Sequence, residues 1–340
     1  MKMREKDDHP YLEIVSMRHL EELLGHSRVD IRRVADRAGR YYRPFDLRKI
    51  AGEGKWRHID NPVGELKLYQ SCIQERMFHD LVLPETMIGA VPGRSIKDNA
   101  LLHLSQPMVV TLDLRDCFPR INDVEVYRVF REVLGCSAEI SSILTKLTTF
   151  QHRLPQGAPT SPAIANLSLL GLHADLTTLA EANDLNCSFY VDDIVFSGAR
   201  ALEVIEPAIL LIHSHGHSVR RNKIKRMPNS TKQTITGAGV NRGVSVGKDR
   251  RRALRSRVFD LSRNGAVAEH ALQSILGEVT WVGWLNSSQG DAIIRSAQKL
   301  LQLPTFPGIR MPKGQFRPCK SFSSHKQSKR TLLAQSTVRG

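Results

Sequence analysis

The stretch Ser188-Phe189-Tyr190-Val191-Asp192-Asp193-Ile194-Val195-Phe196 decides how this chain is interpreted. Apolar runs on both sides of the paired aspartates predict two strands joined by a tight turn, with the two carboxylates at its tip. Acidic residues are common in exposed turns, so an ordinary surface hairpin is the competing interpretation.

Another carboxylate lies within a strand-like run, where Asp113 ends the apolar stretch that begins at Val109. Burying such a charge is costly without a partner. If the hairpin pairs with this strand, Asp113, Asp192 and Asp193 converge, and clustered oxygens repel one another unless a hard cation such as Mg²⁺ joins them. A cluster of this kind suits metal-assisted phosphoryl transfer, in which two ions about 3.5–4 Å apart hold the attacking and leaving oxygens.

Four further motifs accompany the hairpin, and together they resemble the reverse transcriptases, specifically the bacterial retron type, over most of the chain. They are Leu112-Asp113-Leu114-Arg115-Asp116-Cys117-Phe118-Pro119, Leu154-Pro155-Gln156-Gly157-Ala158-Pro159-Thr160-Ser161-Pro162, Asn99-Ala100-Leu101-Leu102-His103 and Ile235-Thr236-Gly237. The third fits the Asn-Ala-x-x-His pattern of retron enzymes. The fourth stands where they carry Val-Thr-Gly and departs from that pattern at its first position. Taken singly, each of these last two motifs fits a structural role equally well, a helical histidine and a turn.

The resemblance implies an α+β right-hand polymerase with fingers, palm and a mainly helical thumb. We expect an N-terminal helical extension over residues 1–45 and a fingers and palm catalytic core over residues 46–234. A thumb that binds RNA or duplex follows over residues 235–303, and a basic flexible tail over residues 304–340.

The same resemblance assigns roles to individual residues. The catalytic and metal-binding set is Asp113, Asp192 and Asp193, with two Mg²⁺ ions as cofactor and Mn²⁺ as a substitute. Residues expected at the incoming nucleotide are Arg57, Lys49, Phe118, Gln156 and Lys223. A guanidinium can hold phosphate oxygens with two hydrogen bonds, which favours Arg57 over Lys49. A solvent-facing lysine and a core phenylalanine are the competing interpretations for Lys49 and Phe118. Residues expected to contact RNA are Asn99, His103, Thr236, Gly237, Arg250, Arg251 and Arg255.

Composition and charge agree with a nucleic-acid enzyme. The chain has 340 residues, of which 41% are hydrophobic, and a formal charge of +15 that favours a polyanionic partner. Between Val219 and Phe259, thirteen lysines and arginines face the single acid Asp249. The five cysteines form no Cys-x-x-Cys pair, and the first residues are polar and charged, so we expect a cytoplasmic protein without a zinc site or a membrane span.

The expected function is that of an RNA-directed DNA polymerase, a nucleotidyltransferase. The retron resemblance implies that it copies a structured noncoding RNA, primed from an RNA 2′-hydroxyl, into a branched RNA–DNA product (msDNA) used in anti-phage defence. Partners would then be that RNA and its product, deoxynucleoside triphosphates and an effector protein. Two alternatives stay open: another defence-associated reverse transcriptase without a branched product, and a noncatalytic RNA-binding scaffold.

Overall fold

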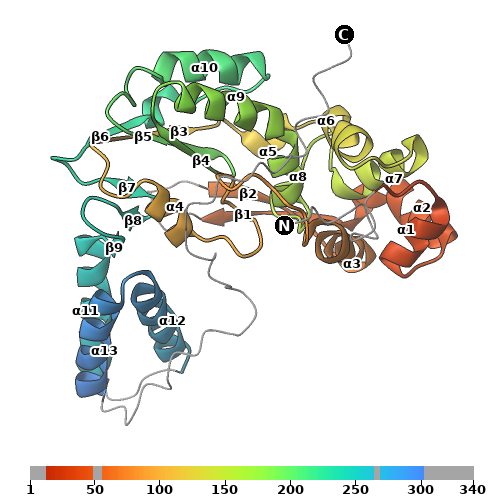
Figure 1. The fold of residues 1–340 in the computed structure, drawn as a ribbon. Helices are drawn as coiled ribbons and strands as arrows, with labels where there is room; N and C mark the ends of the chain where they lie inside the picture. The colour runs from red at the N-terminus through yellow and green to blue at the C-terminus, as the bar shows by residue number, and fades with distance from the viewer. Residues whose placement is uncertain (1–12, 49–55, 264–268, 302–340) are drawn as a thin grey trace, which may run out of the picture.

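The computed structural model describes residues 13–48, 56–263 and 269–301 (Figure 1). A four-stranded antiparallel sheet lies at its centre, with the spatial order β4-β5-β3-β6. The strands span Asn186–Tyr190 (β4), Asp193–Ser197 (β5), Met108–Asp113 (β3) and Lys225–Pro228 (β6).

This sheet separates two apolar cores. Side chains alternate between the faces of a strand, so Leu112 and Ile194 join one core, whereas Val109 and Val195 join the other. Helices α9 (Leu170–Glu181) and α10 (Ile205–Ser214) cover the first face (Figure 1). Helix α4 (Ile96–Leu102) packs on the second face, where Ala100 belongs to the same core as Val109.

An N-terminal layer of helices leads into a β-hairpin. Helices α1 (Met17–Leu24) and α2 (Arg28–Asp36) and the 3₁₀ turn η2 (Ala38–Tyr41) precede the antiparallel strands β1 (Tyr42–Arg48) and β2 (Trp56–Pro62). The chain therefore forms a β-hairpin here, and β1 begins at Tyr42, before the boundary expected at residue 46 between the N-terminal extension and the catalytic core. Lys49 lies outside the described residues.

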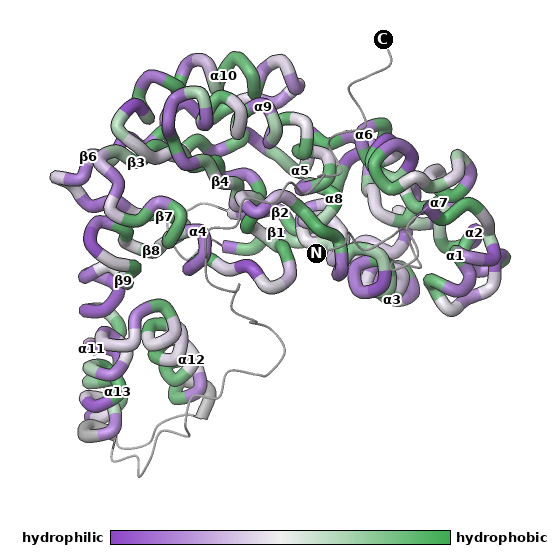
Figure 2. Tube along the Cα trace, viewed as in Figure 1, coloured by the Kyte–Doolittle hydropathy of each residue, from purple (hydrophilic) through white to green (hydrophobic). Residues whose placement is uncertain are grey.

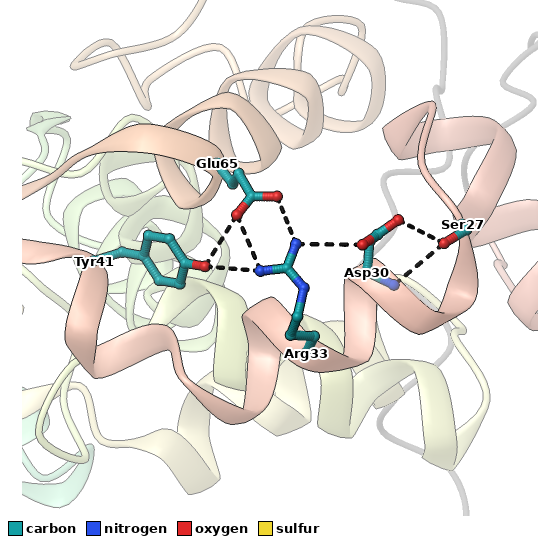
Figure 3. A network of polar contacts seen from close by, with 5 residues as sticks. All are labelled: Ser27, Asp30, Arg33, Tyr41 and Glu65. Carbon is teal, nitrogen blue, oxygen red and sulfur yellow. Dashed lines mark hydrogen bonds and ion pairs between the residues drawn. The ribbon is translucent and has the colours of Figure 1, made fainter.

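A polar network ties this layer together (Figure 3). The Arg33 guanidinium lies 2.7 Å from Glu65 Oε1 and 3.3 Å from Asp30 Oδ1, and the Tyr41 hydroxyl donates to Glu65 Oε2 at 3.0 Å. Ser27 donates to Asp30 at 2.7 Å, and its hydroxyl accepts from the Asp30 amide at the start of α2. The network joins α2 to α3 (Gly64–Ile73). The Arg33 and Glu65 side chains are more than a third exposed, so their pairing contributes little to stability and chiefly fixes orientation.

Further helices complete the larger core. Two of them continue as single π turns, α3 as η3 (Gln74–Phe78) and α6 (Asp123–Arg128) as η4 (Val129–Val133). Helix α6 begins at a capping box, in which Asn122 Oδ1 accepts from the Glu125 amide at 3.0 Å and Glu125 accepts from the Asn122 amide at 2.8 Å. The remaining helices are α5 (Cys117–Arg120), α7 (Ala138–Thr148) and α8 (Ser161–Ser168).

The C-terminal lobe combines a small sheet with three helices. Strands β7 (Thr234–Ile235), β8 (Ala238–Gly239) and β9 (Ser245–Val246) lead into α11 (Lys248–Arg263), α12 (Glu269–Leu285) and α13 (Ser287–Leu301). Polar and apolar residues alternate along these helices (Figure 2), and Leu254, Val279 and Ile293 are buried in the second core. Helices α12 and α13 approach closely at Gly283 and Gly290, where a Cβ on Gly290 would lie 2.2 Å from the Gly283 Cα.

Within the described residues, no single helix is long and apolar enough to cross a membrane. The bent pair α8 and α9, which meet at 54°, satisfies the length and composition criteria only when the two helices are taken together.

Candidate active site

Strand pairing brings the three expected carboxylates to one end of the sheet. Strand β3 pairs with β5 so that Asp113 lies opposite Asp193, and β4 pairs with β5 so that Tyr190 lies opposite Asp193. Two residues, Val191 and Asp192, therefore form the turn. The Leu114 amide donates to the Asp192 carbonyl at 2.9 Å, which ties this turn to the end of β3. The expected hairpin and the convergence of the carboxylates are both present.

The turn is backbone-strained and is supported from outside the hairpin. Val191 has a φ of 59°, a conformation that β-branched residues seldom adopt. Gly89 packs directly against it, since a Cβ on Gly89 would lie 2.5 Å from the Val191 nitrogen. The Ile88 amide donates to the Phe189 carbonyl at 2.7 Å, and Asn166 Nδ2 donates to the Gly89 carbonyl at 2.8 Å. The segment around Gly89 thus holds the turn in a conformation that the turn would not favour alone, a role that its own sequence did not indicate.

Burial and mutual repulsion raise the proton affinity of the two hairpin carboxylates. Burial is the largest cause of the raised pKa of Asp192, and the nearby Asp113 adds to it, while Arg57 and Arg220 act in the opposite direction. Burial, followed by the charges of Asp192 and Asp113, raises the pKa of Asp193 to about 6. The cluster therefore favours binding of positive charge.

Basic side chains supply part of that charge. Arg220 Nη1 lies 2.9 Å from Asp113 Oδ2, and its Nη2 lies 2.5 Å from Asp116 Oδ1. Lys223 Nζ lies 3.3 Å from Asp113 Oδ1. Asp116 and Arg220, to which the sequence analysis assigned no role, belong to the ionic network that surrounds Asp113.

The donor chemistry of the cluster fits a hard divalent cation, because carboxylate oxygens are the ligands that Mg²⁺ prefers. Burial first, and then the neighbouring carboxylates, raise the pKa values of Asp192 and Asp193, so positive charge bound beside them would be favoured. In the part of the chain that the structure describes, however, no three His, Cys, Asp or Glu side chains are arranged to hold a metal ion. Arg220 and Lys223 bind the Asp113 oxygens instead.

A loop expected at the nucleotide is anchored to the β1-β2 hairpin. The Asp60 amide donates to the Gln156 carbonyl at 2.8 Å, and the Gln156 amide lies 3.3 Å from Asp60 Oδ2. Gly157, with a φ of 120°, allows this approach, because a Cβ there would lie 2.7 Å from Ile59 Cγ2. Sequence reasoning missed Asp60, which is only 2% exposed. A lone carboxylate at the end of a strand-like run was the available signal.

Two other residues expected at the nucleotide lie on β2 and α5. Arg57 is exposed on β2, close enough to Asp192 to lower its pKa. Phe118, on α5, is half-buried and packs against the larger core. That position is consistent both with a sugar contact and with a core residue, so its role stays a prediction.

Asn99 and His103 require a correction. Both were expected to contact RNA, but both side chains are fully buried. His103 Nδ1 lies 2.7 Å from Ser197 Oγ and its Nε2 lies 2.8 Å from Ser188 Oγ, while Ser188 donates to Asn99 Oδ1 at 2.7 Å. The alternation of polar and apolar residues in β4 and β5 leaves these two serines facing α4, where only buried polar partners can satisfy them. Direct RNA contact by these two side chains is therefore wrong for this conformation.

The remaining expected RNA contacts lie in the C-terminal lobe. Thr236 and Gly237 form the two-residue turn between β7 and β8, with φ values of 46° and 87°. Arg250 Nε lies 3.0 Å from Glu278 Oε1, and its guanidinium stacks over Trp281 at 4.1 Å from the ring centroid. Arg251 and Arg255 line a basic hollow with Lys248 and Arg252. RNA binding by these residues stays a prediction.

An antiparallel sheet that presents clustered carboxylates beside basic side chains defines the site of a nucleotidyl-transfer enzyme. A family described as reverse transcriptase (RNA-dependent DNA polymerase) matches residues 47–238, more than half of the chain. The chain belongs to the reverse transcriptase family. This membership confirms the α+β polymerase fold and the enzyme class, RNA-directed DNA polymerase, that the sequence predicted.

Individual relatives narrow the comparison to retrons. The chain is 30% identical to the retron Mx65 reverse transcriptase of Myxococcus xanthus over 75% of its own length and 64% of that protein. It is 27% identical to the retron Se72 reverse transcriptase of Salmonella heidelberg over 76% of its own length and 70% of that protein. Among solved structures, telomerase from Candida tropicalis in complex with the TWJ fragment of telomeric RNA is 13% identical, with a TM-score of 0.45 over 77% of this chain and 53% of that one.

Proposed function

We propose that this chain is a retron reverse transcriptase that copies a structured noncoding RNA into DNA from an RNA 2′-hydroxyl primer. Its product would be a branched RNA–DNA (msDNA) that serves anti-phage defence in the cytoplasm with an effector protein. The observation that carries the catalytic part is the pairing of β3 with β5, which places Asp113 opposite Asp193 and next to Asp192. The similarity to retron enzymes over about three quarters of the chain supports the rest.

Asp113, Asp192 and Asp193 would hold two Mg²⁺ ions, with Mn²⁺ as a substitute. When bound, such ions activate the attacking hydroxyl and stabilise the charge that develops on the transferred phosphate. In the reaction, the primer hydroxyl oxygen forms a bond to the α-phosphorus of a deoxynucleoside triphosphate, and the bond to the pyrophosphate leaving group breaks. The hydroxyl proton leaves to solvent or to a neighbouring base.

The basic residues around the cluster support the proposal that a triphosphate binds there. Arg57 and Lys223 approach the carboxylates from β2 and from the 3₁₀ turn η5 (Arg221–Lys223), so a triphosphate bound beside Asp113 and Asp192 would meet positive charge from two directions. Asp60 holds the Gln156 loop against β2, the strand that carries Arg57. Lys223, which lies 3.3 Å from Asp113, would exchange this carboxylate for phosphate oxygens when the nucleotide binds.

Helix α11 provides the surface best suited to an RNA backbone. Two of its arginines pair with Glu278, Arg250 at 3.0 Å and Arg257 at 2.5 Å, and Arg250 also stacks over Trp281. Arg251 Nε donates to the Val246 carbonyl at 3.1 Å. The opposite set lines a hollow of about 320 Å³ that contains no acidic residue in its lining: Lys248, Arg251, Arg252 and Arg255. Such a surface binds phosphates largely independently of sequence, and its affinity falls steeply with salt.

Catalysis is tested with a homopolymeric RNA template and a DNA primer. Asp192→Asn should lower extension by orders of magnitude and leave RNA binding nearly unchanged, since the carboxylate acts on charge that develops in the transition state. Equal extension by wild type and variant in Mg²⁺ would contradict the assignment. RNA binding by a wild type that extends no primer would instead identify a noncatalytic scaffold.

The retron assignment needs a separate measurement on nucleic acid that copurifies with the protein. Ribonuclease and a debranching enzyme should convert the bound product to a shorter, discrete DNA on a gel. An unbranched DNA, or one linked to a protein side chain, would place the enzyme in another defence-associated class while leaving its polymerase chemistry intact.

A further inference from the structure

A buried polar chain connects helix α4 to both strands of the catalytic hairpin. His103, just after α4, contacts Ser197 on β5 through Nδ1 at 2.7 Å and Ser188 on β4 through Nε2 at 2.8 Å. Ser188 in turn donates to Asn99 Oδ1 at 2.7 Å. All four side chains are fully buried, so water cannot replace any of these bonds.

The direction of each hydrogen bond follows from its neighbours. Burial lowers the pKa of His103 to about 3, so the imidazole is neutral at physiological pH, with one donor and one acceptor nitrogen. Because the Ser188 hydroxyl donates to Asn99, it must accept from His103 Nε2. Nδ1 then carries no proton and accepts from the Ser197 hydroxyl. The four groups form one directed chain from β5 through the imidazole to β4 and back to α4.

These hydrogen-bonded side chains lie on the strands that carry the carboxylates, so they can affect the position of the carboxylates. Strand β4 lies at the edge of the four-stranded sheet, beside β5, and an isolated parallel bridge joins its Phe189 to Met87. Ser197 follows Asp193 by four residues, a separation of about 13 Å along the extended strand β5. Ser188 lies two residues before the end of β4, after which the turn leads to Asp192. Because side chains alternate along a strand, Ser197 and Asp193 lie on the same face of β5. His103 therefore binds both arms of the hairpin on the face that presents Asp193.

Helix α4 itself is firmly placed. Ser95 and Asp98 form a capping box at its start, and Ala100 is buried with Val109 and Val195 in the second core. Lys97 Nζ donates to the Trp284 carbonyl at 3.1 Å, which links α4 to α12 of the C-terminal lobe. A helix fixed in this way is a suitable anchor for a hairpin whose turn is strained at Val191.

We propose that His103 is a positioning residue, which fixes the relative placement of β4 and β5 and thereby the reach of Asp192 and Asp193 toward Asp113. This inference rests on the proposed polymerase function. The proposal gives the Asn-Ala-x-x-His motif a structural purpose, which is to orient the hairpin. Its Asn and His are four residues apart at the end of one helix, and there they contact two serines on neighbouring strands.

The test compares four variants by steady-state primer extension on the homopolymeric template, with melting temperatures measured in parallel. Ser197→Ala removes one hydroxyl without opening a large cavity, and His103→Ala removes the whole connection. Because a displacement of about 1 Å in a reacting group can lower a rate roughly a hundredfold, kcat should fall by about tenfold to a hundredfold while KM for the nucleotide changes by less than about twofold. His103→Gln restores a donor and an acceptor and should recover much of kcat.

His173→Ala is the matched control. His173 is also a buried histidine, only 4% exposed, and its ring packs against Phe189 of β4 with the centroids 5.0 Å apart. It contacts Thr86 Oγ1 at 2.7 Å and forms no hydrogen bond with β4 or β5 among the described residues, so its removal tests packing against β4 without loss of a hydrogen bond to it. It should lower the melting temperature with a much smaller change in kcat. If His103→Ala fails to fold, Ser197→Ala and His103→Gln decide the matter.

Three results would overturn the proposal: an unchanged kcat in Ser197→Ala, a kcat loss in His173→Ala as large as that in the His103 variants, or a rise in KM in place of a fall in kcat. Each presupposes a wild type that extends the primer. A wild type without activity would instead refute the proposed function.

Discussion

Replacing Asp193 by Asn should stabilise the protein while abolishing its activity. In the folded chain, burial and the neighbouring carboxylates raise the pKa of Asp193 from 3.8 to about 6. The native state therefore binds this proton more tightly than the unfolded chain does, and the free energy of unfolding falls as the pH rises from about 4 to about 6. At pH 7 the destabilisation amounts to about 3 kcal/mol, and at pH 5 to about half of that.

The isosteric amide carries no charge, so Asp193→Asn should remove this penalty. Without divalent cations, its melting temperature should exceed that of the wild type by roughly 6 °C at pH 7 and roughly 3 °C at pH 5, taking about 2 °C per kcal/mol for a chain of this size. Asp249→Asn, at a carboxylate that is 95% exposed, controls for the substitution itself. Added Mg²⁺ should raise the melting temperature of the wild type at pH 7 more than that of Asp193→Asn, because the cation relieves the same repulsion.

A melting difference between Asp193→Asn and wild type that is independent of pH, or that has the opposite sign, would refute this account. It would mean that Asp193 is already compensated in the folded chain. The carboxylate cluster would then gain no electrostatic stabilisation at Asp193 from a bound cation.

Three further predictions concern other parts of the site. Gly89→Ala should destabilise the protein by about 1–3 kcal/mol and lower kcat, because its Cβ would meet the backbone of the hairpin turn, whereas Gly39→Ala, with open space around its Cβ, should do neither in melting and extension assays. Phe118→Ala should raise the incorporation of ribonucleotides relative to deoxynucleotides in competition assays; an active variant with unchanged selectivity would make Phe118 a core residue. Arg255→Ala should weaken RNA binding and reduce the slope of log K against log salt by about 1 in filter-binding titrations, whereas Arg257→Ala, whose side chain is paired within the lobe, should leave the slope nearly unchanged.

The hairpin and its carboxylates could be predicted from sequence because residues 188–196 contain both strands and the turn between them. Pairing with the Asp113 strand followed from the cost of an isolated buried charge. The supporting contacts could not be predicted in this way, because each joins segments far apart in the chain. Asp60 and Gln156 are 96 residues apart, and His103 and Ser197 are 94 apart.

His103 illustrates how a motif can be recognised in the sequence while its location is predicted wrongly, at an RNA-binding surface and not in the protein core. The spacing of Asn99 and His103 places both on one side of a helix end, but it does not reveal whether that side faces solvent or a sheet. The available signal lay elsewhere, in Ser188 and Ser197, which lie on the two strands that flank the turn. A hydroxyl buried in such a strand needs a polar partner, and a histidine can serve two hydroxyls at once.

The ionic contacts of Asp113 explain why the free-energy cost of the clustered charges is borne by Asp192 and Asp193 of the hairpin. Asp113 binds Arg220 and Lys223 directly, at 2.9 and 3.3 Å, so its charge is balanced in the free protein. Within the described residues, no ion pair joins a base to Asp192 or Asp193, which receive positive charge only from bases farther away. A cation that enters the site therefore gains most at the hairpin. Because the gain depends on where the hairpin lies, we expect the strained turn, Gly89 and His103 to influence how strongly the site would hold a cation.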